Sequence, residues 1–275
     1  MPELPETETI ARDLDRDVSG ATIHGVEVSR GDVLREIDPR SLKRRLTGRR
    51  IQRCWRRAKL IVLELDSGDS IVVQPRFTGA LLIDHGQLPQ SELQYSTLFF
   101  SLSDGRKLHY RDIRRLGTVA VMSAPRFAEY SAGLGVEPLD PTFGAGELSG
   151  ILRARAQAVK KVLMDQRLIV GIGNIYANEA LWRASIDPSR AAGMINTMEA
   201  GRLHEALVSV LTESIASRGT SFRDYRDASG ARGSFADKLE AYGRGGHPCT
   251  RCGNNLVETH AVDGRTTVFC SRCQR

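Results

Sequence analysis

The hydrophobic and polar positions follow two successive patterns along the first half of the chain. Residues 5–18 place apolar side chains at helical spacing between Asp and Arg residues, which predicts an amphipathic helix that ends before Gly20. Short apolar runs then alternate with turn residues, a pattern typical of β-hairpins. The strands expected from these runs are 23–28, 60–65, 70–74, 97–102, 107–110 and 118–122. The first half is therefore predicted to be an antiparallel β-sandwich or barrel flanked by helices.

Helical spacing replaces the strand pattern beyond Pro125. Helices are expected near 148–152, over 174–182 and over 198–217. The glycine-rich segment that follows is long for a compact domain, and such loops are usually functional or mobile. The chain is thus predicted to be an α+β protein with an N-terminal domain at 1–124, a linker at 125–140, a helical domain at 141–217, a loop region at 218–246 and a cysteine-rich tail at 247–275.

Composition narrows the class of protein. The chain has 275 residues, 41% of them hydrophobic, which is enough to form the cores of two domains. No apolar run reaches the length of about 18 residues that a membrane span needs, and the first residues are acidic where a signal peptide is basic. We therefore expect a soluble, intracellular protein that is localised in the cytoplasm and does not bind a membrane.

The charge is unevenly distributed. The net charge is +6, but eleven basic and only two acidic residues lie between Arg35 and Lys59. Such a segment is typical of proteins that bind polyanions, because each basic group set against a phosphate releases counterions. A solvated basic face would have the same composition. Charge alone does not decide between the two interpretations.

Four of the five cysteines form a C-x2-C-x17-C-x2-C pattern in the tail: Cys249, Cys252, Cys270 and Cys273. Each pair can bind one side of a tetrahedral ion, and the intervening residues suit a β-hairpin. Disulfides are the competing interpretation, which the absence of a secretion signal disfavours. The pattern predicts one structural Zn²⁺ with no open coordination position. Cys54 is expected to be a small buried apolar side chain.

A Gly-x-Gly-Asn sequence, Gly171 to Asn174, lies between two expected helices. Glycines let backbone N–H groups approach a phosphate, and the following helix offers its positive N-terminal end to the same anion. A tight turn between helices, with Asn174 as the N-cap, is compatible with phosphate binding and is the preferred interpretation from this motif alone.

Five motifs, in order along the whole chain, together resemble the formamidopyrimidine-DNA glycosylase and endonuclease VIII family. They are Pro2-Glu3-Leu4-Pro5-Glu6-Thr7-Glu8, Arg56-Arg57-Ala58-Lys59, the segment from Met164-Asp165 to Glu179, Tyr242-Gly243-Arg244 and the four-cysteine tail. The resemblance implies a helix-two-turn-helix within the helical domain. It also implies a bifunctional DNA glycosylase and abasic-site lyase that binds damaged double-stranded DNA as a monomer.

The resemblance implies that the amine of Pro2, exposed by removal of Met1, is the nucleophile. A secondary amine that adds to C1′ of deoxyribose gives an iminium cation, which promotes elimination of the flanking phosphates. An α-amine has an ordinary pKa near ~8, so a usable fraction is neutral at cellular pH. Glu3 is then the expected general acid and Glu6 a supporting carboxylate. A disordered terminus is the alternative interpretation of Pro2, and the rest of the match disfavours it.

Further site residues follow from the same resemblance. The residues expected to bind phosphate are Lys59, Asn174 and Arg265, with Lys160 and Tyr176 as additional contacts. The residues expected to fill the space left by an extruded nucleotide are Phe77, Arg114 and Leu116, beside Arg115. Family members typically carry Met and Phe where this chain has Phe77 and Leu116, so the two apolar wedges differ while the arginine is kept.

The loop at 218–246 distinguishes the branches of the family. Its length and glycines match the loop that caps 8-oxoguanine in the formamidopyrimidine branch, so an oxidised-purine substrate is expected. Two other functions stay open. One is an endonuclease VIII type of enzyme that excises oxidised pyrimidines, and the other is a zinc protein that binds DNA without catalysis.

Overall fold

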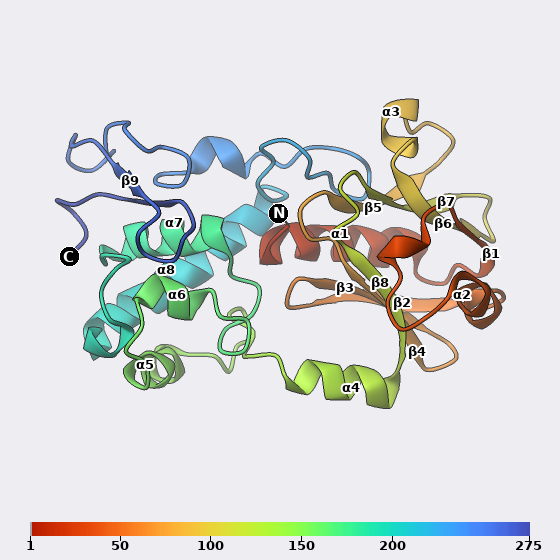
Figure 1. Cartoon of the computed structure of the whole chain (residues 1–275), viewed down its shortest axis with the longest axis horizontal. Coiled ribbons are helices and arrows are strands. Elements are labelled where there is room, and N and C mark those ends of the chain that lie inside the picture. The colour runs from red at the N-terminus through yellow and green to blue at the C-terminus, as the bar shows by residue number, and fades with distance from the viewer. Residues whose placement is uncertain (1) are drawn as a thin grey trace. The chain divides into compact units, whose positions relative to one another are not determined.

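The computed structural model describes residues 2–275 (Figure 1). The expected removal of Met1 concerns a residue outside this range. Contacts divide the chain into two compact units. Unit 1 comprises the residues up to Ala132 together with Ser217–Ser234, and unit 2 comprises Gly133–Ala216 and Phe235–Arg275. No helix among the described residues is long and apolar enough to cross a membrane.

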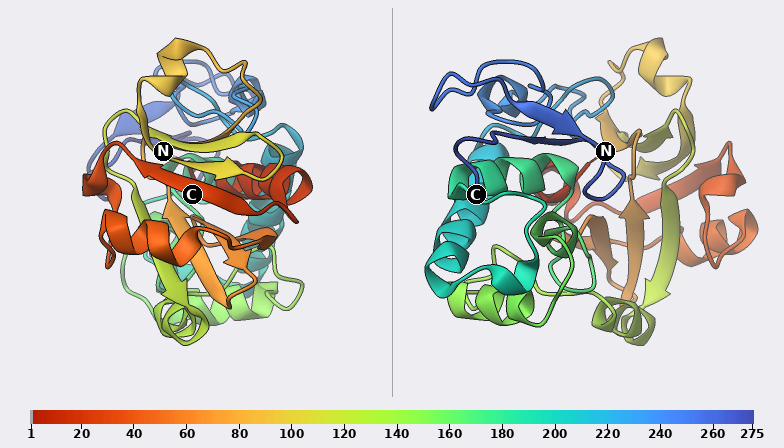
Figure 2. Two further views of the ribbon diagram at one scale, coloured as in Figure 1. Left: turned by 90° about the vertical axis from the view of Figure 1, so that its right-hand side faces the viewer. Right: turned by 60° about the vertical axis from the view of Figure 1, so that its left-hand side comes forward.

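Unit 1 contains two antiparallel four-stranded sheets (Figure 2). One sheet has the order β1-β6-β7-β5, with β1 (Ile23–Val28), β5 (Gly79–Asp84), β6 (Ser96–Leu102) and β7 (Lys107–Asp112). The other has the order β2-β3-β4-β8, with β2 (Ile51–Arg57), β3 (Leu60–Leu65), β4 (Asp69–Gln74) and β8 (Thr118–Ser123). The predicted antiparallel sandwich is confirmed, including both hairpins.

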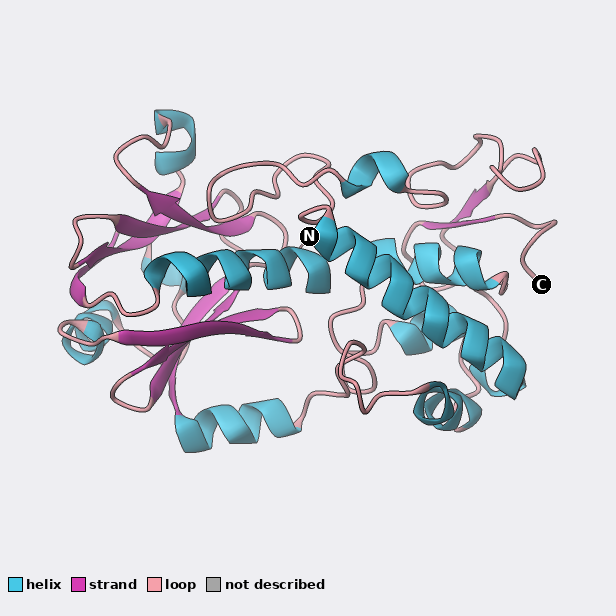
Figure 3. Cartoon of the chain, turned by 180° about the vertical axis from the view of Figure 1, so that it is seen from behind, coloured by secondary structure: helices cyan, strands magenta, loops and turns pink. Residues whose placement is uncertain are grey.

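The core of unit 1 explains this arrangement. Apolar side chains of both sheets, such as Phe100 and Ile71, belong to one buried cluster. Helix α1 (Leu4–Val18) adds Ile10 and Leu14 to this cluster, because its apolar positions recur every three or four residues. In Figure 3, α1 lies along the edge of the sandwich, between the two sheets. The helix predicted at 5–18 is confirmed.

The basic segment at 35–59 forms helix α2 (Pro39–Leu46), strand β2 and the turn after it. Three of its arginines pair with carboxylates of unit 1: Arg45 with Asp69 at 2.7 Å, Arg53 with Glu64 at 2.5 Å and Arg56 with Glu8 at 2.8 Å. Part of the positive charge of this segment is therefore neutralised by carboxylates within unit 1. The remaining elements of unit 1 are η1 (Gly31–Val33), α3 (Gln90–Leu93) and α4 (Ala124–Ala132).

Unit 2 is helical, as the sequence predicted. Its elements are α5 (Ala145–Arg153), α6 (Val159–Leu163), α7 (Asn174–Ala184), η2 (Ala192–Met194), α8 (Thr197–Ala216), η3 (Phe235–Lys238), β9 (Val257–Thr259) and β10 (Thr267–Phe269). α7 and α8 lie side by side (Figure 2). β9 and β10 pair antiparallel, so the tail contains the expected hairpin.

Candidate functional site

The start of α1 holds two buried carboxylates. Glu3 is the N-cap residue and is 2% exposed, and Glu6 is 1% exposed. Glu6 Oε2 accepts the backbone N–H of Glu3 at 2.8 Å, an arrangement that the Glu-x-x-Glu spacing and the following Leu4-Pro5 favour at a helix start. Pro2, directly before this helix, is also buried. The structure thus brings the three expected residues together at one helix end.

Glu6 also holds the base of the loop 217–234. Its second oxygen, Oε1, accepts the backbone N–H of Thr220 at 2.7 Å. Gly219 has a φ of +84°, and a Cβ there would lie 3.0 Å from the Glu6 side chain. Tyr225 is buried nearby, and its hydroxyl donates to the carbonyl of Glu6 at 3.4 Å. Burial and the adjacent Glu6 carboxylate raise the pKa of Tyr225 well above its ordinary value.

Lys59 lies at the tip of the β2–β3 hairpin, in the two-residue turn Ala58-Lys59. The tip is connected to α1 through Arg56, whose Nε donates to Glu8 at 2.8 Å and whose Nη1 donates to the carbonyl of Ala58 at 3.0 Å. Burial alone would raise the pKa of Glu8, but Arg56 and Arg12 lower it below its ordinary value. The hairpin that carries Lys59 is therefore anchored near the start of α1.

Two loops of unit 1 present the expected wedge residues. Phe77 and Leu116 are 46% and 41% exposed, and the guanidinium of Arg114 lies 5.2 Å from the centre of the Phe77 ring. The loops are joined beneath these side chains, because Thr78 Oγ1 accepts the backbone N–H of Arg114 at 2.9 Å. Arg115 pairs with Asp32 at 3.0 Å.

In unit 2, Arg265 lies in the turn between β9 and β10. Its side chain is exposed and makes no hydrogen bond or ion pair within residues 2–275. Lys160 supports this turn and is fully buried. Its amine donates to Thr267 Oγ1 at 2.7 Å and to the carbonyl of Thr266 at 3.2 Å. The same amine lies 3.5 Å from the carboxylate of Asp263. The expected phosphate contact of Lys160 stays a prediction, and its buried amine makes it a support of the hairpin.

Asn174 is the first residue of α7, and the N-cap is Gly173. The expectation that Asn174 is the N-cap is therefore wrong, because its side-chain amide donates to the carbonyl of Thr266 at 2.9 Å instead. Asn178, one turn later, accepts the backbone N–H of Val268 at 2.8 Å and is buried. Both asparagines thus bind the hairpin that carries Arg265.

Two further residues of α7 are buried. The hydroxyl of Tyr176 lies 2.6 Å from Ser214 Oγ, so this side chain contacts α8, and its expected role in DNA binding stays a prediction. Glu179 accepts three successive backbone N–H groups of residues 240–242, at 2.8 to 3.0 Å. Burial nevertheless raises the pKa of Glu179 above its ordinary value. Sequence reasoning assigned no role to Asn178 or Glu179, although each is polar within an apolar helix.

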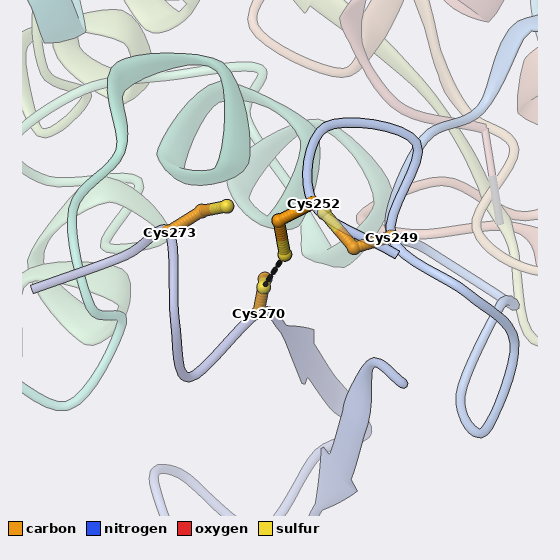
Figure 4. A group of neighbouring side chains, drawn as sticks. All are labelled: Cys249, Cys252, Cys270 and Cys273. Carbon is orange, nitrogen blue, oxygen red and sulfur yellow. Dashed lines mark hydrogen bonds between the residues drawn. The ribbon is translucent and has the colours of Figure 1, made fainter. Parts of the chain in front are cut away.

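The four cysteines of the tail point toward one another (Figure 4). Their sulfur atoms all lie within 4.8 Å of one another, and the sulfurs of Cys252 and Cys270 are 3.5 Å apart. A tetrahedral ion with metal–sulfur bonds near 2.3 Å needs sulfurs about 3.8 Å apart, so this cluster fits a metal such as Zn²⁺. The cysteines are free thiols in residues 2–275, and a single cluster of all four tail sulfurs favours a metal site over disulfides. Burial and the nearby Asp15 raise the pKa of the separate Cys54 to about 12, so it is an inert thiol.

Arg251, between the first two cysteines, connects the cluster to α7. Its guanidinium lies 3.9 Å from the centre of the Trp182 ring and donates to the carbonyls of Trp182 at 2.9 Å and Arg183 at 3.0 Å. These carbonyls belong to the last turn of α7, where a cation is favourable. Trp182 shares a small buried cluster with Cys249 and Cys270. The cysteine cluster is therefore packed on the helix that begins with Asn174.

Comparison with known proteins connects these observations. Residues 1–119 match the model of the formamidopyrimidine-DNA glycosylase N-terminal domain, and residues 134–226 match that of the formamidopyrimidine-DNA glycosylase H2TH domain. A formamidopyrimidine-DNA glycosylase of Heliobacterium modesticaldum is 38% identical over 278 residues, with both chains fully covered.

Two solved structures of the Lactococcus lactis Fpg protein resemble this chain over the full length of both. One is a complex with DNA containing N7-benzyl-Fapy-dG, with a TM-score of 0.91 and 30% identity. The other is a complex with DNA containing an oxidised pyrimidine, with a TM-score of 0.90 and 29% identity.

Proposed function

This chain belongs to the formamidopyrimidine-DNA glycosylase family, and we propose that it is a DNA glycosylase and abasic-site lyase that excises oxidised purines from duplex DNA in base excision repair. The observation that carries this proposal is the pair of buried carboxylates behind Pro2, joined to the base of the loop 217–234. The enzyme acts as a monomer on damaged DNA, and we expect it in the cytoplasm, at the nucleoid where its substrate lies.

The amine of Pro2, once Met1 is removed, attacks C1′ of the damaged nucleotide. The new N–C1′ bond replaces the bond to the base, the sugar ring opens, and the iminium cation that results lets the 3′ and then the 5′ phosphate leave by β,δ-elimination. Both oxygens of Glu6 accept backbone N–H groups, so Glu6 acts as an acceptor that orients the helix start. The side chain of Glu3 accepts one backbone N–H in the same capping box, and we assign to Glu3 the role of the acid that protonates the ring oxygen.

The groups that bind DNA come from both units. Lys59 is a half-buried cation and Arg265 is an exposed one, and both suit phosphates on the reacting strand. Asn174 is the first residue of α7, where the positive end of the helix favours a phosphate. We assign Lys160 and Tyr176 to the support of these contacts, since both are buried. Phe77, Arg114 and Leu116 fill the space of the extruded nucleotide, and Arg115 binds close to them.

The cysteine cluster binds one structural Zn²⁺ through Cys249, Cys252, Cys270 and Cys273. Four thiolates leave no open position, so the ion stabilises the hairpin rather than taking part in the reaction. The hairpin in turn holds Arg265 through the contacts of Lys160, Asn174 and Asn178. Removing the metal with a chelator should release one zinc per chain and weaken DNA binding, and re-addition of Zn²⁺ should restore it.

Borohydride trapping tests the activity. The protein is incubated with duplexes that contain 8-oxoguanine opposite C, an oxidised pyrimidine opposite G or an abasic site, and borohydride reduces any iminium to a stable adduct. We expect adducts with 8-oxoguanine and abasic duplexes, and much weaker trapping in Pro2→Gly. An adduct with the pyrimidine but not with 8-oxoguanine would favour the endonuclease VIII type of specificity. If no duplex gave an adduct, the enzyme hypothesis would be wrong, and the remaining interpretation would be a protein that binds DNA without catalysis.

A further inference from the structure

The two ends of the loop 217–234, residues 217–220 and 233–234, lie against each other and form a tight neck. Ser234 donates its backbone N–H to the carbonyl of Ser217 at 2.9 Å, and Thr220 and Ser234 form a β-bridge. At Gly233 a Cβ would lie 2.2 to 2.3 Å from the carbonyl oxygens of Gly219 and Arg218, so the two ends of the loop are in direct contact. The loop therefore leaves and re-enters the fold at one place, as compact surface loops do.

Arg218 in this neck has an unusual backbone. Its φ is +60°, in the left-handed region that favours glycine, and Gly219 follows with a φ of +84°. A non-glycine residue persists in this region when its surroundings hold it there. The side chain of Arg218 shows what holds it.

The guanidinium of Arg218 lies between two buried aspartates. Nη2 donates to Asp13 Oδ2 at 2.5 Å and to Asp227 Oδ2 at 2.6 Å, and Nε donates to Asp227 at 2.8 Å. The side chains of Asp13 and Asp227 are only 4% and 0% exposed. Without Arg218, two buried carboxylates would face each other, and Asp13 would keep Arg16, at 3.3 Å, as its ion-pair partner.

Each aspartate connects Arg218 to a different element. Asp13 lies on α1, seven residues after Glu6, so both carboxylates are on the same face about two turns apart. Asp227 lies in the far arm of the loop, where its other oxygen accepts the backbone N–H groups of Ser229 and Ala231 at 3.0 and 2.9 Å. Arg218 thus joins the helix, the neck and the far arm, and its link to α1 does not involve the proposed catalytic carboxylates.

We propose that Arg218, clamped between Asp13 and Asp227, is a positioning residue that fixes the loop 217–234 on α1 and so determines the specificity for a damaged base. The inference rests on the proposed function, in which Pro2 attacks C1′ and Glu3 protonates the ring oxygen, and on the expectation that this loop covers the damaged base. The loop is also held on the sheet, by the hydrogen bond from Ile83 N–H to the carbonyl of Ala228 at 2.8 Å. Both the loop and the reacting groups Pro2 and Glu3 are attached to α1. The clamp therefore fixes the distance between the loop that covers the base and the groups that act on the sugar.

Arg218→Ala and Arg218→Gly test the clamp together. Glycine suits the left-handed backbone but cannot pair with the aspartates, so the two variants separate the backbone from the ion pair. Arg16→Ala is the matched control, because it removes an arginine from the same Asp13 without touching the loop. Arg218→Lys, which keeps the charge, should recover part of the loss.

Two measurements are made on each variant. Excision of 8-oxoguanine under single-turnover conditions should fall about tenfold in both Arg218→Ala and Arg218→Gly, while cleavage at a preformed abasic site, which has no base to cover, should stay within about twofold. In the free protein, hydrogen exchange of amides 219–234 should quicken about tenfold or more. Arg16→Ala should change neither.

The outcomes separate the clamp from the proposed function. Wild-type protein that processes no duplex would refute the proposed function, and the exchange measurement would still decide whether the clamp exists. Unchanged exchange, or an Arg218→Gly variant that behaves like wild type, would refute the clamp. An equal loss of base excision and abasic-site cleavage would show that Arg218 supports the whole site, and its role in specificity would be wrong.

Discussion

The start of α1 and the turn between β9 and β10 organise their functional groups in opposite ways. At α1 the proposed reacting groups are themselves buried, and backbone N–H groups of Glu3 and Thr220 bind the carboxylate of Glu6. At the turn, the functional Arg265 is exposed, and the buried polar groups lie beneath it. At the start of α1, the buried hydrogen-bonded groups are the proposed reacting groups themselves. At the turn between β9 and β10, the buried hydrogen-bonded groups only support the exposed Arg265.

The difference follows from what each group must do. An acid has to deliver a proton to one atom, so a fixed and dry position makes it effective. A cation that binds phosphate acts over a longer range and can stay hydrated, provided that its support is rigid. Substitutions at α1 should therefore affect the chemical step, and substitutions at the turn should affect stability or DNA binding.

The largest effect is expected from Glu3→Gln. Loss of a general acid should slow base excision about 100-fold or more, with DNA affinity little changed. Single-turnover rates and gel-shift affinities measure the two quantities separately. Glu147→Gln, at an exposed position of α5, is the control. A parallel loss of affinity would mean that Glu3 acts in binding, and the contrast between the two regions would fail.

Lys160→Met tests the support beneath Arg265. Methionine keeps the length of the side chain but leaves Asp263 and the carbonyl of Thr266 without the amine, which should lower the free energy of unfolding by about 3 kcal/mol. Urea denaturation measures this change. Lys161→Met is a matched control, because the neighbouring lysine is exposed. Equal stability of the two variants would show that the buried amine is dispensable.

Arg265→Ala should weaken DNA binding about tenfold and reduce the dependence of log affinity on log salt by about one unit, since one phosphate contact is lost. Stability and zinc content should stay unchanged because the exposed side chain makes no hydrogen bond or ion pair within residues 2–275. Arg272→Ala, an exposed arginine between the last two cysteines, is the control. A loss of stability in Arg265→Ala would remove the distinction between support and functional group.

The smallest effect concerns the Glu8–Arg56 pair that anchors the Lys59 hairpin to α1. The pKa of Glu8 is lowered in the folded protein, so the pair stabilises the fold above the ordinary pKa of about 4.3 and loses this contribution as the pH falls through the folded value. Glu8→Gln should cost about 1 kcal/mol at pH 7 and less at pH 3. Urea midpoints at both pH values measure it. A pH-independent difference would mean that the pair contributes by packing.

Much of the fold could be predicted because local signals mark its elements. The apolar residues of α1 recur at helical spacing, and the hairpins at 60–74 and 97–110 show as apolar runs on either side of the turns at 66–69 and 104–105, although β3 and β4 are largely buried. β5 was missed because it pairs with β7, so no tight turn joins it to a neighbouring apolar run. α2 was missed because only Leu42 and Leu46 are buried among its charged residues.

The site could be predicted where it lies in local motifs, and less where it depends on distant partners. The cysteine spacing predicted a cluster that the structure confirms. The buried position of Lys160 could not be foreseen, because its partner Thr267 lies 107 residues away. Arg218 likewise became notable only through Asp13, 205 residues earlier in the chain.

Trp182 packs between Arg251 and the cysteine cluster, so its intrinsic fluorescence can report on the state of that cluster. The chain has two tryptophans, and Trp55 lies in unit 1, edge-on to Phe127 at 5.6 Å. The emission of Trp182 in a Trp55→Phe background would therefore report whether the metal hairpin is assembled. Trp182→Phe would leave a signal for the sandwich alone, so the order in which the two units melt can be read without any added label.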